Sequence, residues 1–137
     1  MSQFQLTLRV GIITLCVLGL YVSYFMLRKY VMAARGELEG PSVVMSPRAK
    51  LGRVPNAQSG LFYYSLMLVL TPFLSPAHPL VMYAALAGAV AASLTSLYLA
   101  YSLLFVTRMS CVYCWVGHAV NWSLLALLIA AARAAYR

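Results

Sequence analysis

The sequence is poor in charged residues, and above all in acidic ones. Of its 137 residues only 9% are charged, and the two acids, Glu37 and Glu39, stand against ten lysines and arginines. Soluble domains carry about 25% charged and about 45–50% apolar residues, whereas this chain is 64% hydrophobic. The composition excludes a water-soluble globule. It also excludes a disordered chain, which needs low hydrophobicity and high charge.

Long polar stretches are scarce as well, because residues 28–59 form the only one. Both acids lie in it, together with six of the ten basic residues and several prolines and glycines. The rest of the chain consists of apolar runs, and about 20 apolar residues in a helix cross a bilayer. The predicted spans cover about residues 6–27, 60–74, 80–106 and 111–132. We therefore expect an all-α membrane protein, a four-transmembrane-helix bundle with one long loop between helices 1 and 2. Residues 1–137 form a single domain in this prediction, with no fused thioredoxin-like domain.

The first apolar run does not have the features of a cleaved signal peptide. It is too long, and the bulky residues Tyr24, Phe25 and Met26 stand where a cleavage site of small residues is required. We expect a retained helix. The connections at 77–79 and 107–110 are short, so they predict antiparallel neighbouring helices. Both chain ends then lie on one side of the membrane, and the 28–59 loop lies on the other.

The basic surplus, a net charge of +8, has its simplest explanation in the membrane. No stripe of interleaved basic and aromatic residues indicates nucleic-acid binding, and we expect no nucleic-acid partner. Lysines and arginines instead face lipid head groups and set the orientation. Seven of the ten lie on the side of the 28–59 loop and three on the side of the termini. We therefore expect an integral, multi-pass membrane protein with the loop side in the cytoplasm. The alternative is a periplasmic, extracellular or lumenal loop side.

Cysteine is rare, and two of the three cysteines are close together. Cys16 lies within the first apolar run, where a lone cysteine behaves as a small hydrophobic residue. Cys111 and Cys114 form a CxxC pair at a loop-to-helix junction, where unpaired N–H groups and the helix dipole stabilise a thiolate. Such a pair at the membrane boundary suits exchange between protein thiols and a lipid-soluble carrier. The alternatives are a structural disulfide or chance spacing in a non-catalytic scaffold, although so short a loop gains little stability from a disulfide.

A metal site is a competing interpretation of the same segment. His118 follows Cys114 by four residues and shares its helix face. Cys111, Cys114 and His118 could bind Zn(II) or Cu(I), as in a membrane metal-binding or metal-transport protein. Only three ligands are present, so we favour redox chemistry and expect no metal. His118 then either lines a pocket behind the cysteines or is a hydrogen-bonded group between helices, because an unpaired histidine in a membrane is costly.

Two segments resemble the vitamin K epoxide reductase family. Residues 111–121, CVYCWVGHAVN, are similar to the family's fourth-helix motif. Residues 46–64, SPRAKLGRVPNAQSGLFYY, are similar to its loop and second-helix signature, a Ser-Pro-x-Ala-Lys run followed by Pro-Asn and Gly-x-x-x-Tyr. The resemblance extends over about residues 8–132 and is closest in kind to archaeal and bacterial homologues. The chain also looks similar to an archaeal branch of the family whose orientation in the membrane is inverted. That orientation agrees with the excess of basic residues on the side of the 28–59 loop.

The resemblance implies a redox enzyme, a quinone-dependent thiol:disulfide oxidoreductase. In such an enzyme four helices surround ubiquinone, menaquinone or a related quinone, and electrons pass to it from protein thiols, which become disulfides. Cys111 would exchange with incoming thiols, and Cys114 would face the quinone. Asn56 matches an asparagine that hydrogen-bonds a quinone oxygen, and Tyr64 is a further expected binding residue. His118 stands where the family usually has a tyrosine, so its imidazole would supply the second hydrogen bond.

The loop departs from the family pattern. Family members usually have two more cysteines between helices 1 and 2, whereas this loop has none and Gly40 stands where the second is expected. The hypothesis that follows is a separate thioredoxin-like protein that delivers thiols directly to Cys111. A cytoplasmic thiol oxidase suits hyperthermophiles, whose intracellular proteins are rich in disulfides.

Overall fold

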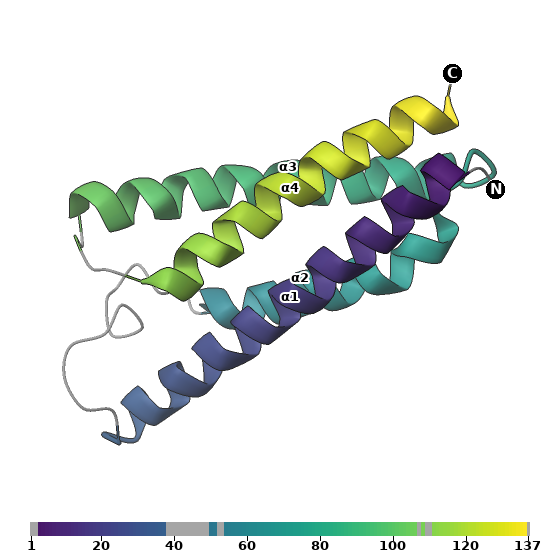
Figure 1. Ribbon diagram of the computed structural model, residues 1–137. Helices are drawn as coiled ribbons and strands as arrows, with labels where there is room; N and C mark the ends of the chain where they lie inside the picture. Colours follow the sequence, from purple (N-terminus) through teal and green to yellow (C-terminus); the bar gives the residue numbers. More distant parts are fainter. Residues whose placement is uncertain (1–2, 38–49, 52–53, 107, 109–110, 137) are drawn as a thin grey trace.

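Four helices make up almost the whole structure, a computed structural model that describes residues 3–37, 50–51, 54–106, 108 and 111–136 (Figure 1). The helices are α1 (Gln3–Ala34), α2 (Asn56–Leu70), α3 (Pro79–Tyr101) and α4 (Val112–Ala135). A 3-10 turn, η3 (Thr71–Phe73), follows α2, and a π-helix, η4 (Ser102–Val106), follows α3. Among the described residues the only strands are β1 (Lys50–Leu51) and β2 (Val54–Pro55), an antiparallel pair leading into α2. The predicted all-α fold is confirmed.

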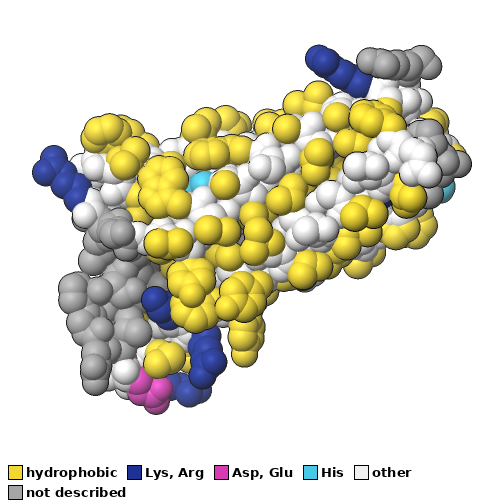
Figure 2. All heavy atoms as spheres, viewed as in Figure 1, with side chains coloured by type: hydrophobic (Ala, Val, Ile, Leu, Met, Phe, Trp, Pro, Cys, Tyr) yellow, Lys and Arg dark blue, Asp and Glu magenta, His cyan; other side chains and the backbone are white. Residues whose placement is uncertain are grey.

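Three of the described helical segments are long and apolar enough to cross a membrane. They are α1, α3 with η4, and α4, with mean hydropathies of 2.2, 1.8 and 1.6. With 15 residues α2 is shorter, about 22 Å long against a hydrocarbon layer of about 30 Å. Figure 2 shows hydrophobic side chains over the middle of the visible face, with Lys and Arg towards its ends. This surface is that of an integral membrane protein, whose exposed apolar side chains face lipid.

The first helix continues beyond the predicted span and includes the start of the predicted loop. It ends where Gly36 takes a φ of +72°, which a residue without Cβ adopts easily. The N–H of Glu37 donates to the Met32 carbonyl at 2.9 Å, and that of Gly36 donates to the Ala33 carbonyl at 3.1 Å. These two hydrogen bonds form a Schellman motif, a regular helix end. The basic pair Arg28 and Lys29 therefore lies on a helix.

The helices are arranged so that α1 and α4 form the centre of the bundle. α1 packs against α2 and α4, and α4 also packs against α3, whereas α2 and α3 make few contacts. The chain termini lie at one end of the bundle, and the first turns of α2 and α4 lie towards the other (Figure 1).

Close packing of α1 against α2 depends on two glycines. A Cβ at Gly19 would lie 2.6 Å from the Tyr64 ring, and a Cβ at Gly60 would lie 2.5 Å from Ser23 Oγ. Small residues at such positions let membrane helices approach each other. The contact holds the Tyr64 ring in place between the helices. Cys16, a free thiol, is fully buried in the adjoining core, as expected of a small hydrophobic residue.

Candidate redox site

The CxxC pair forms the beginning of α4. Cys111 is the N-cap residue, and its Sγ accepts a hydrogen bond from the Cys114 backbone N–H at 3.2 Å. The two cysteines are joined by a disulfide, with their Cα atoms 5.3 Å apart. At a helix N-terminus the free N–H groups and the dipole favour negative charge. The turn is therefore built to stabilise a thiolate on Cys111 when the disulfide opens.

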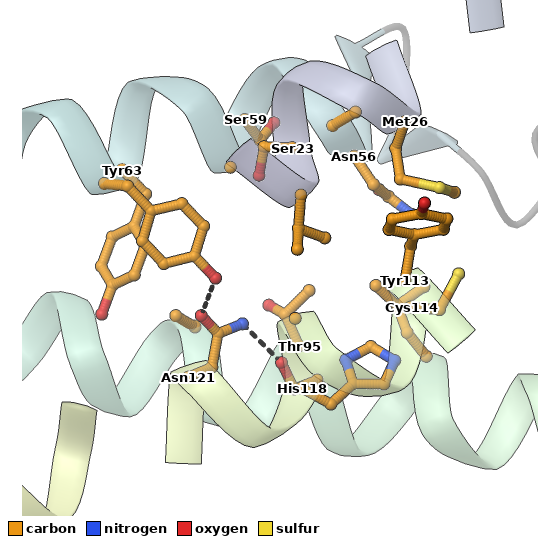
Figure 3. Close-up of a pocket in the computed structure, with 18 of the residues that line it drawn as sticks. Ser23, Met26, Asn56, Ser59, Tyr63, Thr95, Tyr113, Cys114, His118 and Asn121 are labelled. Carbon is orange, nitrogen blue, oxygen red and sulfur yellow. Dashed lines mark hydrogen bonds between the residues drawn. The ribbon is translucent and has the colours of Figure 1, made fainter. Parts of the chain in front are cut away.

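A cavity of about 430 Å³ lies inside the bundle beside this turn. All four helices contribute to its lining, and so do β2 and η4. Cys114 lines the cavity, whereas Cys111 is not among its lining residues. Figure 3 shows Cys114 with Tyr113 and His118 around this space. The two sulfurs thus have different surroundings, and the one that can meet a ligand in the cavity is that of Cys114.

The cavity wall is mainly apolar and carries a small number of polar groups. Of the predicted site residues, Asn56, Tyr64, Cys114 and His118 all line it. Sequence reasoning had not singled out the other polar lining residues, which are Ser23, Tyr30, Ser59, Tyr63, Thr95, Ser96, Ser102, Tyr113 and Asn121. Gly40 and the Ser-Pro-x-Ala part of the loop motif lie outside the described residues.

One wall of the cavity is held by a hydrogen-bond chain through Asn121. Tyr64 Oη donates to Asn121 Oδ1 at 2.5 Å, and Asn121 Nδ2 donates to Ser96 Oγ at 2.6 Å. These bonds connect α2, α4 and α3 (Figure 3). Because its proton is directed to Asn121, the Tyr64 hydroxyl can only accept a hydrogen bond from a ligand. Asn121 was part of the family-like motif, but nothing in the sequence indicated its partners.

His118 is one of the two deeply buried residues of the predicted site, with Tyr64. Its exposed fraction is 6%, and its Nε2 has no hydrogen-bond partner among the described residues. Two tryptophans of the same helix, Trp115 and Trp122, are close to it. Their ring centroids lie 5.8 and 6.0 Å from that of the imidazole. Burying a polar group without a partner costs free energy. A ligand that supplies the missing partner would remove this cost.

Tyr113, one of the two residues between the cysteines, packs against α1. Tyr113 stacks on Phe25, with ring centroids 4.2 Å apart and an interplanar angle of 24°. Lys29 Nζ lies 5.2 Å from the Phe25 centroid and 5.8 Å from that of Tyr113. The Phe25–Lys29 spacing of four residues places both on one face of α1. The sequence could have suggested that pairing, but not its contact with the CxxC turn.

The metal interpretation receives no support from the described part of the chain. There, no three His, Cys, Asp or Glu side chains are grouped so that they could hold a metal ion. Cys111, Cys114 and His118, the set allowed by the sequence spacing, are not such a group. Both sulfurs are instead engaged in the disulfide.

The sequence also matches a known family over most of its length. Residues 10–129 match the vitamin K epoxide reductase family, a region that includes all of α2 and α3, most of α1 and α4, and the CxxC turn. No curated protein matches the sequence. The family match agrees with the apolar helices and with the closely spaced cysteine pair at their boundary. The chain therefore belongs to the vitamin K epoxide reductase family and is a membrane thiol oxidoreductase.

Proposed function

We propose that this protein forms disulfides by passing electrons from protein thiols through Cys111 and Cys114 to a quinone, such as ubiquinone or menaquinone. The observation that carries the proposal is the position of Cys114, which lines a cavity of about 430 Å³ between apolar helices. Sites for small ligands have volumes of about 300–1,000 Å³, mainly apolar walls and a few polar anchors. A lipid-soluble quinone fits this description.

In the thiol half of the reaction, Cys111 is the residue that exchanges with the substrate. A substrate thiolate attacks Cys111 Sγ, the Cys111–Cys114 bond breaks, and Cys114 leaves as a thiolate. A second substrate thiolate then attacks the mixed disulfide, which forms the substrate disulfide and releases Cys111 as a thiolate. Two electrons have passed to the cysteine pair. The N–H of Cys114, 3.2 Å from Cys111 Sγ in the disulfide form, favours this last departure.

In the quinone half, the cavity residues bind and orient the acceptor. A bound quinone supplies the oxidant: it takes two electrons and two protons and leaves as hydroquinone, while the cysteine disulfide re-forms. His118 Nε2, buried without a partner among the described residues, can donate to a quinone carbonyl oxygen in its Nε2–H tautomer. Asn56, the first residue of α2, brings a side-chain amide to the same cavity. Tyr64 lines the same cavity, and its hydroxyl donates to Asn121.

We propose that another protein supplies the thiols, because the one other cysteine of this sequence is not placed to relay them. That cysteine, Cys16, is 0% exposed and lies in the core. A thioredoxin-like protein, which carries a dithiol at its own surface, has the required chemistry. Cys111 at the start of α4 is the position at which it would react.

The function is tested by following the reduction of a short-chain quinone in the purified, detergent-solubilised protein. Reduction should depend on an added dithiol and should continue in Cys16→Ala, because Cys16 has no part in the reaction. Dithiol oxidation that leaves the quinone unchanged would contradict the proposal. Stoichiometric metal in the purified protein, with no quinone reduction, would favour the metal-binding alternative instead.

We also propose that the CxxC end faces the cytoplasm, as in the family's inverted branch. Arg28 and Lys29 on the extended end of α1, Arg35 directly after it, and Arg108 before α4 are on this side. Arg9 and Arg133 are on the other. Cytoplasmic loops carry such an excess. In Cys114→Ser, which leaves Cys111 as a thiol, a membrane-impermeant maleimide should modify Cys111 only after the cells are permeabilised. Rapid labelling of Cys111 in intact cells would place the site outside.

A further inference from the structure

The contact between α1 and the CxxC turn has no part in the chemistry described above. Tyr113 is in van der Waals contact with Phe25, and the Lys29 ammonium lies within 6 Å of both ring centroids, at 5.2 and 5.8 Å. An ammonium at this distance is attracted to the negative faces of aromatic rings. Two rings and one cation, from two helices, therefore form a single cluster next to the cysteines.

The position of Lys29 differs from that of the neighbouring basic residue. Lys29 is half-buried, whereas Arg28 is exposed. The chain's only acids, Glu37 and Glu39, come later in the sequence than the last residue of α1. The Lys29 ammonium lies near two ring faces, beside a turn where reduction of the disulfide creates negative charge.

We propose that Lys29, Phe25 and Tyr113 form a cation–aromatic clamp that holds the first turn of α4 against α1 and stabilises the thiolate produced when the Cys111–Cys114 disulfide is reduced. The proposal rests on the proposed function in one respect, that an incoming protein dithiol reduces this pair during turnover. Lys29 is a positioning residue, because it acts on the cysteines through the Tyr113 ring.

Among the described residues, no Lys, Arg, Asp or Glu lines the cavity with Cys114. The titratable groups that line it with Cys114 are Tyr30 from α1, Tyr63 and Tyr64 from α2, and Tyr113 and His118 from α4. The lining residues from α3 and η4 are neither charged nor titratable. They are Gly88, Ala91, Ala92, Thr95, Ser96, Leu99, Ser102 and Leu103. Arg108, three residues before Cys111, is exposed. Among the described cations, Lys29 is the one recorded in contact with a residue of the CxxC turn.

The clamp is tested by the pH dependence of Cys111 alkylation in the full-length, dithiol-reduced protein. Iodoacetamide reacts with the thiolate, and peptide mass spectrometry distinguishes Cys111 from Cys16. Lys29→Gln should move the midpoint of the profile upwards, so that alkylation below the midpoint slows by about three- to tenfold. Lys29→Arg should restore the rate to within about twofold, since a guanidinium keeps the charge and stacks on rings.

A matched control separates the clamp from a general surface charge. Arg28→Gln removes the same charge from the adjacent, exposed position and should leave the profile unchanged. Equal shifts in Lys29→Gln and Arg28→Gln, or no shift in Lys29→Gln, would overturn the proposal. If Lys29→Gln does not fold, Phe25→Leu serves as the second variant, because it keeps the charge and an apolar contact but removes one ring. It should shift the alkylation profile in the same direction by a smaller amount. An unchanged profile in Phe25→Leu would also refute the clamp.

The role of the rings is tested by a double-mutant cycle. In a Tyr113→Leu background, Lys29→Gln should have less than half of its effect in the otherwise unaltered protein; an equal effect would show that the charge does not act through the stack. The readout needs no quinone. An unchanged Cys111 profile in Lys29→Gln, with normal quinone turnover, would refute the clamp and leave the proposed function intact. A shifted profile in Lys29→Gln, with no quinone reduction by the unaltered protein, would refute the proposed function and leave the clamp intact.

Discussion

Cys114→Ala should lower dithiol-driven quinone reduction by at least about 1,000-fold, the usual order of loss for a reacting group. The reason is positional, because Cys114 is the sulfur on the cavity side of the disulfide. Without it the pair cannot close again after a quinone takes the electrons. The measurement is the steady-state rate of quinone absorbance change, with Cys16→Ala as the matched cysteine control, in which the rate should stay near that of the unaltered protein.

The same variant should accumulate a covalent complex with the thiol donor. The Cys111 thiolate can still attack the disulfide of the oxidised donor, which forms a mixed disulfide and releases one donor cysteine as a thiolate. The substitution removes Cys114, the cysteine that would expel the donor by re-forming the Cys111–Cys114 bond. Cys111→Ala in combination with Cys114→Ala should eliminate the complex, as seen on a non-reducing gel. Trapping that persists in the double variant would show that incoming thiols react elsewhere.

His118→Phe should raise the quinone KM by about 10- to 100-fold, the range expected for loss of a buried hydrogen bond to the ligand. Removal of an imidazole whose Nε2 has no partner among the described residues should not destabilise the free protein. The variant should therefore unfold at the same temperature as the unaltered protein, or higher. A residue with a purely structural role would show the opposite pattern, with a lower unfolding temperature and an unchanged KM.

His78 provides the control for this substitution. It is exposed, and it is the N-cap residue that precedes α3 at the other end of the bundle. His78→Phe should leave the quinone KM unchanged, and His118→Phe should leave the thiol KM unchanged. A quinone KM that is unaltered in His118→Phe would remove His118 from the binding site.

The sequence predicted the helices well because the backbone of an apolar run in a membrane must satisfy its own hydrogen bonds, and a helix does so within the run. It also indicated that the second run, 60–74, was short, and α2 with η3 is indeed short. The predicted membrane span ends at about residue 27, and α1 continues beyond it to Ala34. Arg28 and Lys29 mark where the membrane ends, but a helix can continue into the head-group region, and here it ends only at the cap formed by Gly36.

The site was predictable only to the extent that its residues belong to recognisable motifs. Asn56 and His118 are far apart in sequence, yet both line the cavity with Cys114. The Tyr64–Asn121 hydrogen bond and the Phe25–Tyr113 stack depend on which helix faces meet. A single sequence does not contain that information, because many rotations of an apolar helix about its axis bury similar surfaces.

The most direct test of the central claim is a single turnover. The protein is reduced, freed of dithiol and mixed with a quinone in the absence of oxygen. Hydroquinone should appear in an amount equal to the Cys111–Cys114 disulfide that re-forms, and Cys114→Ala should give none. Disulfide that re-forms without hydroquinone, or hydroquinone in equal yield from Cys114→Ala, would contradict electron transfer from this cysteine pair to the quinone.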